Sequence, residues 1–227
     1  MKTIAFLCAL PLLFWGCDAK NKVKYVYLRS YITCYYENDL VMWMRTRTVK
    51  ESGKTKTDYY LCCTEYEGGG AKNYFSPDFG TTGKEAEKYM ELAERNGDLS
   101  YNRMEPYDME SPNRRCWADN FKAMHVKCLN ASWSDRYPAG SLLDDLVQVE
   151  FRSYADYIRR GYPEGDRGIK DCKIRISELK ETDLSMISGG FSIYFSVLPP
   201  AGSYEMEVTF VTTEGEEKTA TCTLAIE

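Results

Sequence analysis

Six short stretches in the second half of the chain alternate between apolar and polar residues, and this alternation constrains the fold more than any other feature. A period of two places every second side chain on the same face of a β-strand. Turn signals rich in Gly and Pro separate the stretches. Evenly spaced strands of this kind predict an antiparallel β-sandwich of immunoglobulin-like size over residues 121–227. The stretches are 124–128, 147–151, 172–176, 191–197, 204–210 and 220–226.

The first half predicts a smaller α+β module over residues 25–97, an antiparallel hairpin sheet with one helix. Residues 25–36 alternate, and residues 40–49 are the expected partner strand of a hairpin. This register places Cys34 opposite Met42. A third strand is expected near 58–66. The whole chain is therefore expected to be mostly β.

A helix is expected near residues 83–95. Thr82 and Glu85 have the spacing of a capping box, and Asn96–Gly97 is a typical helix stop. Residues 98–120 carry two prolines and many polar groups, so we interpret them as a linker between the two units.

The N-terminus has the pattern of a secretory signal. Lys2 precedes an apolar run that is too short to span a bilayer as a stable helix. Gly16-Cys17 at its end resembles a bacterial lipobox, in which the Cys thiol is acylated. We therefore predict a signal peptide over 1–16, lipidation of Cys17 and a lipidated tether over 17–24. Phe14 and Trp15 depart from the lipobox pattern, which leaves ordinary cleavage after Ala19 as the alternative.

Charge and histidine content argue against several classes of partner. The chain has 29 basic and 34 acidic residues, a net charge of −5, so it lacks the basic surface typical of a nucleic-acid-binding protein. It has a single His, and no pair of its cysteines has C-x-x-C spacing, which argues against a structural zinc site. We predict no metal and no cofactor.

Seven cysteines remain after the signal peptide and Cys17 are set aside, and an odd number outside the cytoplasm leaves at least one unpaired. Cys128 and Cys222 point inward from the first and last strands of the expected sandwich. Those strands are neighbours in immunoglobulin-like folds, so this pair is the candidate disulfide. The competing hypothesis is that all seven thiols are free and packed as small apolar groups.

No catalytic constellation is evident. His125, the single imidazole, lies between Met124 and Val126 and points away from the inward-facing set. Asp144 and Asp145 are adjacent in sequence and would point to opposite faces of a strand, so they cannot act as a carboxylate pair without a turn. We predict that the protein is not an enzyme.

The most informative surface is an aromatic face on the expected N-terminal hairpin. Tyr, Trp and Arg are enriched at binding hot spots, and aromatic rings can stack on sugars or on protein partners. The alternative is that the helix or the second unit covers this face. The candidate binding residues are Tyr25, Tyr27, Tyr31, Tyr35, Trp43, Arg45 and Arg47.

Two segments, 137–158 and 200–210, together with the lipobox-like signal, resemble uncharacterised lipoproteins of gut Bacteroidota. That resemblance implies an exported, lipid-anchored protein and supplies no activity or site residues.

These features predict a cell-envelope lipoprotein with a binding or assembly role. Its partners would be the membrane, through the N-terminal lipid, and a protein or glycan. Surface-exported lipoproteins often carry an acidic run after the Cys, whereas here Asp18 is followed by Lys20 and Lys22. We therefore expect an outer-membrane anchor and favour the periplasmic face over the cell surface. The alternatives are an envelope hydrolase whose carboxylates come together only in the fold, and a structural subunit of an envelope machine.

Overall fold

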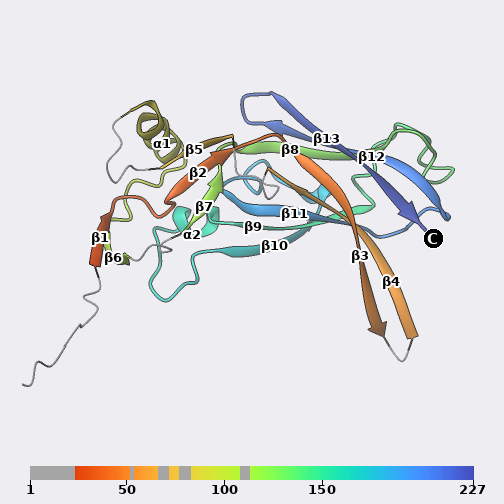
Figure 1. Ribbon diagram of the computed structural model, residues 1–227, viewed down its shortest axis with the longest axis horizontal. Helices are drawn as coiled ribbons and strands as arrows, with labels where there is room; N and C mark the ends of the chain where they lie inside the picture. Colours follow the sequence, from red (N-terminus) through yellow and green to blue (C-terminus); the bar gives the residue numbers. More distant parts are fainter. Residues whose placement is uncertain (1–23, 52–53, 66–71, 77–82, 108–112) are drawn as a thin grey trace, which may run out of the picture.

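The computed structural model describes residues 24–51, 54–65, 72–76, 83–107 and 113–227 (Figure 1). The predicted signal peptide, Cys17 and the tether up to residue 23 lie outside the described residues. The fold is mostly β, as predicted. Neither α-helix of the described part is long and apolar enough to cross a membrane.

Two sheets form the larger part of the molecule, and all six strands predicted in the second half are present. A three-stranded sheet has the order β13-β12-β8, and a five-stranded sheet has the order β10-β9-β11-β4-β3. The first contains β8 (Phe121–Cys128), β12 (Gly202–Thr212) and β13 (Glu217–Ile226). The second contains β3 (Val41–Glu51), β4 (Lys54–Thr64), β9 (Val147–Ser153), β10 (Lys170–Arg175) and β11 (Ile187–Phe195).

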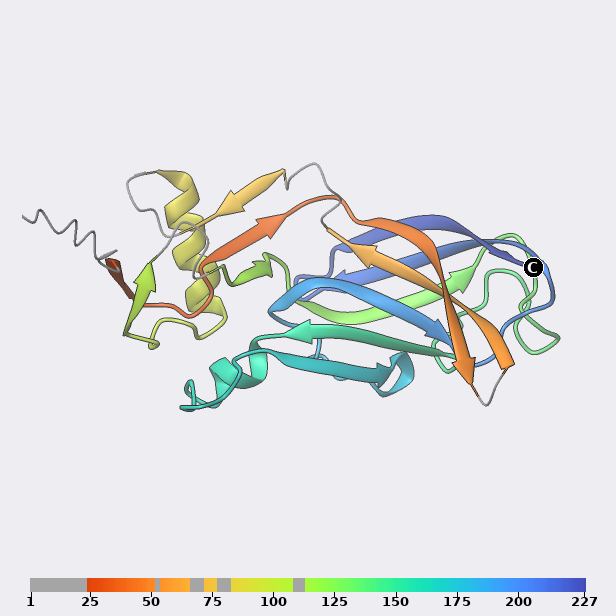
Figure 2. The same ribbon diagram turned by 60° about the horizontal axis from the view of Figure 1, so that its bottom comes forward.

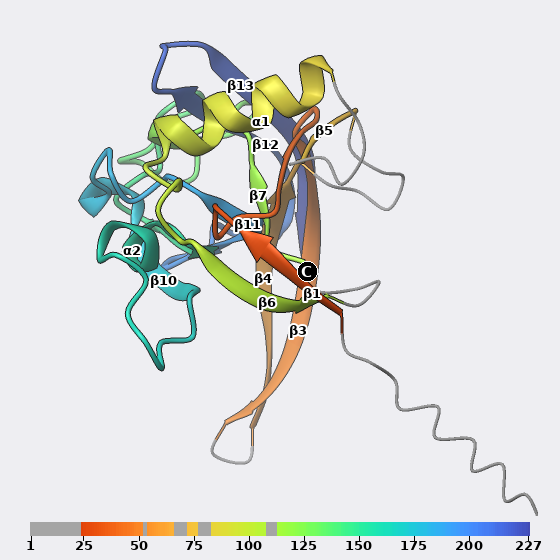
Figure 3. The same cartoon turned by 90° about the vertical axis from the view of Figure 1, so that its left-hand side faces the viewer.

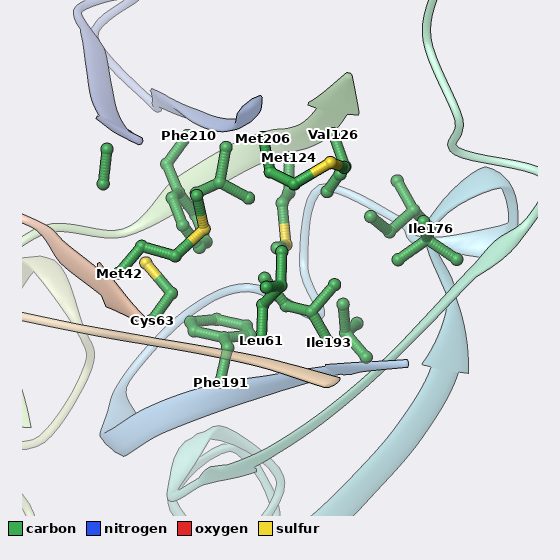
Figure 4. Close-up of a cluster of buried hydrophobic side chains, with 14 of the residues drawn as sticks. Met42, Leu61, Cys63, Met124, Val126, Ile176, Phe191, Ile193, Met206 and Phe210 are labelled. Carbon is green, nitrogen blue, oxygen red and sulfur yellow. The ribbon is translucent and has the colours of Figure 1, made fainter. Parts of the chain in front are cut away.

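The main hydrophobic core lies between these sheets (Figure 4). Met124, Met206 and Phe210 point from the three-stranded sheet toward Leu61 and Phe191 of the five-stranded sheet. The alternation in the sequence is the cause, because every second residue of each strand faces this layer. The opposite face of the five-stranded sheet is consequently free of core side chains.

Smaller elements gather at the N-terminal end of the molecule (Figures 2 and 3). β1 (Lys24–Leu28) pairs with β6 (Arg103–Tyr107), and β2 (Cys34–Glu37) lies between β5 (Asn73–Phe75) and β7 (Arg115–Trp117). Helix α1 (Lys84–Arg95) ends at Asn96–Gly97 as predicted, and Gly97 has a φ of 69°. The remaining helices are α2 (Ala155–Arg159) and the 3₁₀ helix η1 (Ile176–Glu178).

The predicted hairpin between residues 25–36 and 40–49 is wrong. β3 pairs with β4 along its whole length, and Met42 faces Cys63 rather than Cys34. The segment 25–36 itself is broken, because the carboxylate of Asp98 accepts the backbone N–H groups of Tyr31 and Ile32, both at 2.8 Å. These bonds tie the chain to the end of α1 and interrupt the strand.

The range 98–120 is not a featureless linker, since it contains β6 and β7. Nor does it separate two cores. The core between the sheets takes Met42 and Leu61 from the first half, and a second core around Tyr31 takes Tyr154 and Tyr157 from the second half. Sheet pairing of β4 with β11 is the physical reason, because it places the long hairpin β3–β4 in the same sheet as the C-terminal strands.

The predicted Cys128–Cys222 disulfide is also wrong, because β8 and β13 are not neighbours. Met206 of β12 pairs with Cys128 on one side and with Cys222 on the other. Two strand spacings amount to about 9.5 Å, beyond the ~7 Å that a disulfide allows between Cα atoms. All seven cysteines of the described residues are free.

Candidate functional site

The structure divides the predicted aromatic face, and two of its members are core residues. Tyr31 is 8% exposed and Tyr35 is fully buried. Tyr31 lies at the centre of a tyrosine cluster, 4.6 Å from the ring of Tyr157 and 5.2 Å from that of Tyr101. Its burial raises the pKa of the phenol to about 12. These two side chains stabilise the fold and cannot contact a partner.

The other members lie on two separate elements. Tyr25 and Tyr27 are 60% and 59% exposed on β1, where they share a face with Met104 of the partner strand. Trp43, Arg45 and Arg47 lie on β3, on the side of the five-stranded sheet that faces away from the core. The predicted single face is therefore not formed, and two of the β3 residues, Trp43 and Arg45, adjoin a cavity.

Trp43 and Arg45 line a cavity of about 450 Å³ where the small sheet β5-β2-β7 meets the outer face of the five-stranded sheet. This volume falls in the range of small-ligand pockets. Seven strands contribute to the wall, so the cavity exists only in the folded chain. The lining residues are Tyr36, Trp43, Arg45, Cys62, Cys63, Thr64, Tyr74, Arg115, Arg152, Ser188, Gly189, Gly190, Phe191 and Ser192.

The floor of the cavity is an irregular segment of β11. The register between β11 and β9 shifts between Ser188 and Ser192, which marks a bulge. Gly190 is required there, because a Cβ atom would lie 2.6 Å from the carbonyl oxygen of Cys63. The carbonyl of Gly189 accepts hydrogen bonds from Trp117 Nε1 at 2.5 Å and from the Tyr36 hydroxyl at 3.3 Å. The floor is thus held by the core beneath it.

Three arginines give the cavity its charge. Arg45, Arg115 and Arg152 line it from β3, β7 and β9, and no lining residue in the described part of the chain is Asp or Glu. Arg45 lies 5.6 Å from the ring centre of Trp43, and none of the three forms an ion pair with any described residue. We call this set the arginine pocket. Guanidinium groups without partners, beside an aromatic ring, form a site for an anion.

Two thiols, those of Cys62 and Cys63, line the arginine pocket. Cys63 is fully buried, and Cys62 is the more accessible of the two. It is half-buried, and burial raises its pKa, an effect that the nearby Arg45 only partly offsets. A raised pKa keeps the thiol protonated and unreactive. Cys62 is therefore a lining residue rather than a reactive one.

Comparisons with known proteins do not identify a ligand for the arginine pocket. No protein-family model, curated protein or solved structure gives a significant match.

The remaining sequence candidates lie elsewhere. His125 Nδ1 lies 2.8 Å from Asp144 Oδ2, and Asp145 accepts the hydroxyl of Tyr137 at 2.8 Å. The two adjacent carboxylates lie in a turn rather than on a strand, and they have separate partners. Among the described residues, no group of His, Cys, Asp and Glu side chains could hold a metal ion.

Sequence reasoning identified Trp43 and Arg45 but missed the rest of the arginine pocket. Arg115 lay in the supposed linker, and Arg152 had no local feature to distinguish it. Gly189–Gly190 was among the Gly-rich turn signals expected between the strands. A glycine pair inside an alternating apolar stretch also indicates a bulge or a close backbone approach, and that signal could have revealed the floor.

Proposed function

We propose that the protein is a lipid-anchored binding protein of the cell envelope that takes the anionic group of its ligand in the arginine pocket. One observation carries the proposal. Three arginines surround one cavity, and among the described residues they have no ion-pair partner and the lining holds no carboxylate. In a chain with a net charge of −5, such a local excess of positive charge is not a consequence of composition. It has to be explained by what it binds.

The residues that line the arginine pocket limit the class of ligand that it can bind. Arginine forks match carboxylates, sulfates and phosphates through paired N–H groups. Trp43 supplies an apolar ring face at the rim, and the hydroxyl of Ser192 supplies a donor and an acceptor. A ligand that combines an acidic group with a ring fits this arrangement best. An acidic sugar is the simplest such ligand within the predicted glycan class.

We favour binding over hydrolysis. Glu150 and Asp171 lie on the outer face of adjacent strands and line one neighbouring cavity. Their side chains are 37% and 65% exposed, and each forms an ion pair, with Lys173 and Arg167 respectively. A glycosidase acid usually sits in an apolar enclosure that keeps it protonated. This pair has no such enclosure.

The arginine pocket can be tested with Arg152→Gln. Charge-assisted hydrogen bonds contribute about 1.5–3 kcal/mol, so we expect the affinity for glucuronate to fall by about 10-fold or more. Titration calorimetry at low salt measures the effect, and added salt should weaken the wild-type affinity. Arg136→Gln is the matched control, because Arg136 is 79% exposed in a distant loop. Equal affinity of the two variants would contradict the proposal.

The membrane anchor is tested by Cys17→Ala. If the Cys17 thiol carries the lipid, the variant should move entirely from the membrane fraction to the soluble fraction. Incorporation of labelled palmitate and the intact mass of the N-terminus give independent readouts. A mature N-terminus at Lys20 would show cleavage after Ala19 and would contradict the prediction that Cys17 is lipidated. Protease accessibility in whole cells then tests the expected periplasmic orientation on the outer membrane.

A further inference from the structure

The arginine pocket continues into two further cavities along the outer face of the five-stranded sheet. A second cavity, of about 460 Å³, shares Arg152, Gly190 and Ser192 with it. A third, of about 420 Å³, shares Glu150 and Lys173 with the second. The three cavities are therefore neighbours in a row across the strands, and we call this row the trough.

Strand register explains why the three cavities lie on one face of the sheet. Trp43, Cys62, Ser192, Glu150 and Lys173 are successive cross-strand partners from β3 to β10. Cross-strand partners project from the same face of a sheet. The next row along the strands contains Tyr60 and Tyr194, whose rings are stacked with centres 5.1 Å apart. One end of the trough is thus cationic, and its middle is polar and aromatic.

The charge changes along the trough. Beyond the arginine pocket, carboxylates and bases occur in pairs: Glu150 with Lys173 at 2.5 Å, and Asp58 with Arg47 at 3.4 Å. A polyanion with a charge on every unit, such as a single-stranded nucleic acid, requires a uniformly basic groove. The trough instead matches a chain with an acidic group at one position and neutral, hydroxyl-bearing units elsewhere.

The backbone of the sheet argues against an extended peptide as the ligand. Peptides that add to a sheet bind a free strand edge through main-chain hydrogen bonds. β4, β11 and β9, which form the middle of the trough, are paired on both sides. Recognition here depends on side chains alone. Aromatic rings and paired charges suit the apolar faces and the hydroxyl groups of sugars.

We propose that the trough binds a linear oligosaccharide, with an acidic sugar in the arginine pocket and neutral sugars extending over Glu150, Lys173 and Tyr194. This inference rests on the proposed function of the arginine pocket and adds the class and the direction of the ligand. The affinity should therefore depend on the length of the neutral part as well as on the acid.

The experiment is calorimetric titration of the full chain, purified in detergent. The probes are glucuronate and oligosaccharide series that carry a single glucuronate and increasing numbers of neutral xylose, glucose or galactose units. We expect at least one series to gain about 10-fold or more in affinity over glucuronate, equivalent to ~1.4 kcal/mol. Neutral oligosaccharides of the same length should bind more weakly. Tyr194→Ala should abolish the gain with length, whereas Tyr27→Ala, an exposed tyrosine on β1, should keep it.

The outcomes separate the two proposals. If glucuronate binds but added neutral units do not increase the affinity, the oligosaccharide proposal is overturned, whereas the proposed function of the arginine pocket stands. Tighter binding of an acidic peptide or a single-stranded oligonucleotide would also overturn it. Failure of glucuronate, sulfate and phosphate alike to bind would overturn the proposed function as well.

Discussion

Trp117→Ala should lower the free energy of unfolding by about 3–5 kcal/mol, equivalent to a fall in Tm of about 10 °C or more. Trp117 is fully buried, and its ring lies 5.5–5.9 Å from those of Phe121, Phe191 and Phe210. Removing the indole leaves a cavity at the junction between the small sheet and the main core. Thermal and urea denaturation measure the loss.

Trp117→Phe serves as the control for this prediction. It keeps most of the ring volume but removes the Nε1–H that donates to the carbonyl of Gly189. That carbonyl retains the hydroxyl of Tyr36 as a donor, so we expect a cost of only about 1 kcal/mol from the lost bond. If Trp117→Ala destabilises no more than Trp117→Phe, then packing at Trp117 does not hold the junction.

Glu65→Gln should become more stable relative to the wild type as the pH rises. Glu65 is fully buried, its Oε1 lies 3.1 Å from Lys218 Nζ, and its Oε2 has no hydrogen-bond partner among the described residues. Burial raises the pKa of this carboxyl to about 7, although Lys218 opposes the rise. Lys218 also pairs with Asp119, and Glu37 lies near enough to add to the repulsion.

The sign of the effect follows from linkage. A carboxyl whose folded pKa lies above its unfolded value, near 4.5, stabilises the fold below pH 4.5, and this contribution is lost as the pH rises through 7. The loss amounts to about 3 kcal/mol above pH 8, whereas Gln is neutral throughout. The difference in unfolding free energy, Glu65→Gln minus wild type, should therefore increase by up to ~3 kcal/mol from pH 4.5 to 8.

Urea denaturation at several pH values between these limits measures the difference. Glu217→Gln removes an exposed carboxylate from the same strand as Lys218 and controls for the loss of one negative charge. A stability difference between Glu65→Gln and the wild type that stays constant with pH would show that Glu65 does not titrate in this range. It would then have to be ionised, with Lys218 as its compensating charge.

Features that depend only on neighbouring residues could be predicted from the sequence. Period-two alternation gave all six strands of the second half, and Asn96–Gly97 gave the end of α1, because Gly accepts the positive φ of a helix stop. β3 also lies close to the range of 40–49 expected from the sequence. Local geometry and the alternation of burial suffice for such predictions.

Which strands pair and which faces are buried could not be predicted from the sequence and depend on tertiary packing. Residues 25–36 alternate like a strand, yet hydrogen bonds to the buried carboxylate of Asp98 interrupt them. β3 pairs with β4 instead, and its apolar side chains pack against the C-terminal strands. The placement of β12 between β8 and β13 excluded the predicted disulfide in the same way. Burial depends on partners distant in sequence, so a local pattern cannot select among them.

The arginine pocket is the clearest case of this division. Trp43 and Arg45 are neighbours on one strand and could be identified as a candidate surface. Arg115 and Arg152 come from strands that follow much later in the chain. Arg152 reaches the cavity because β11 joins β4 to β9, and Arg115 reaches it from the small sheet, where β7 pairs with β2. A site assembled from several strands is a property of sheet order, which long-range packing of the core decides, so residue spacing could not reveal it.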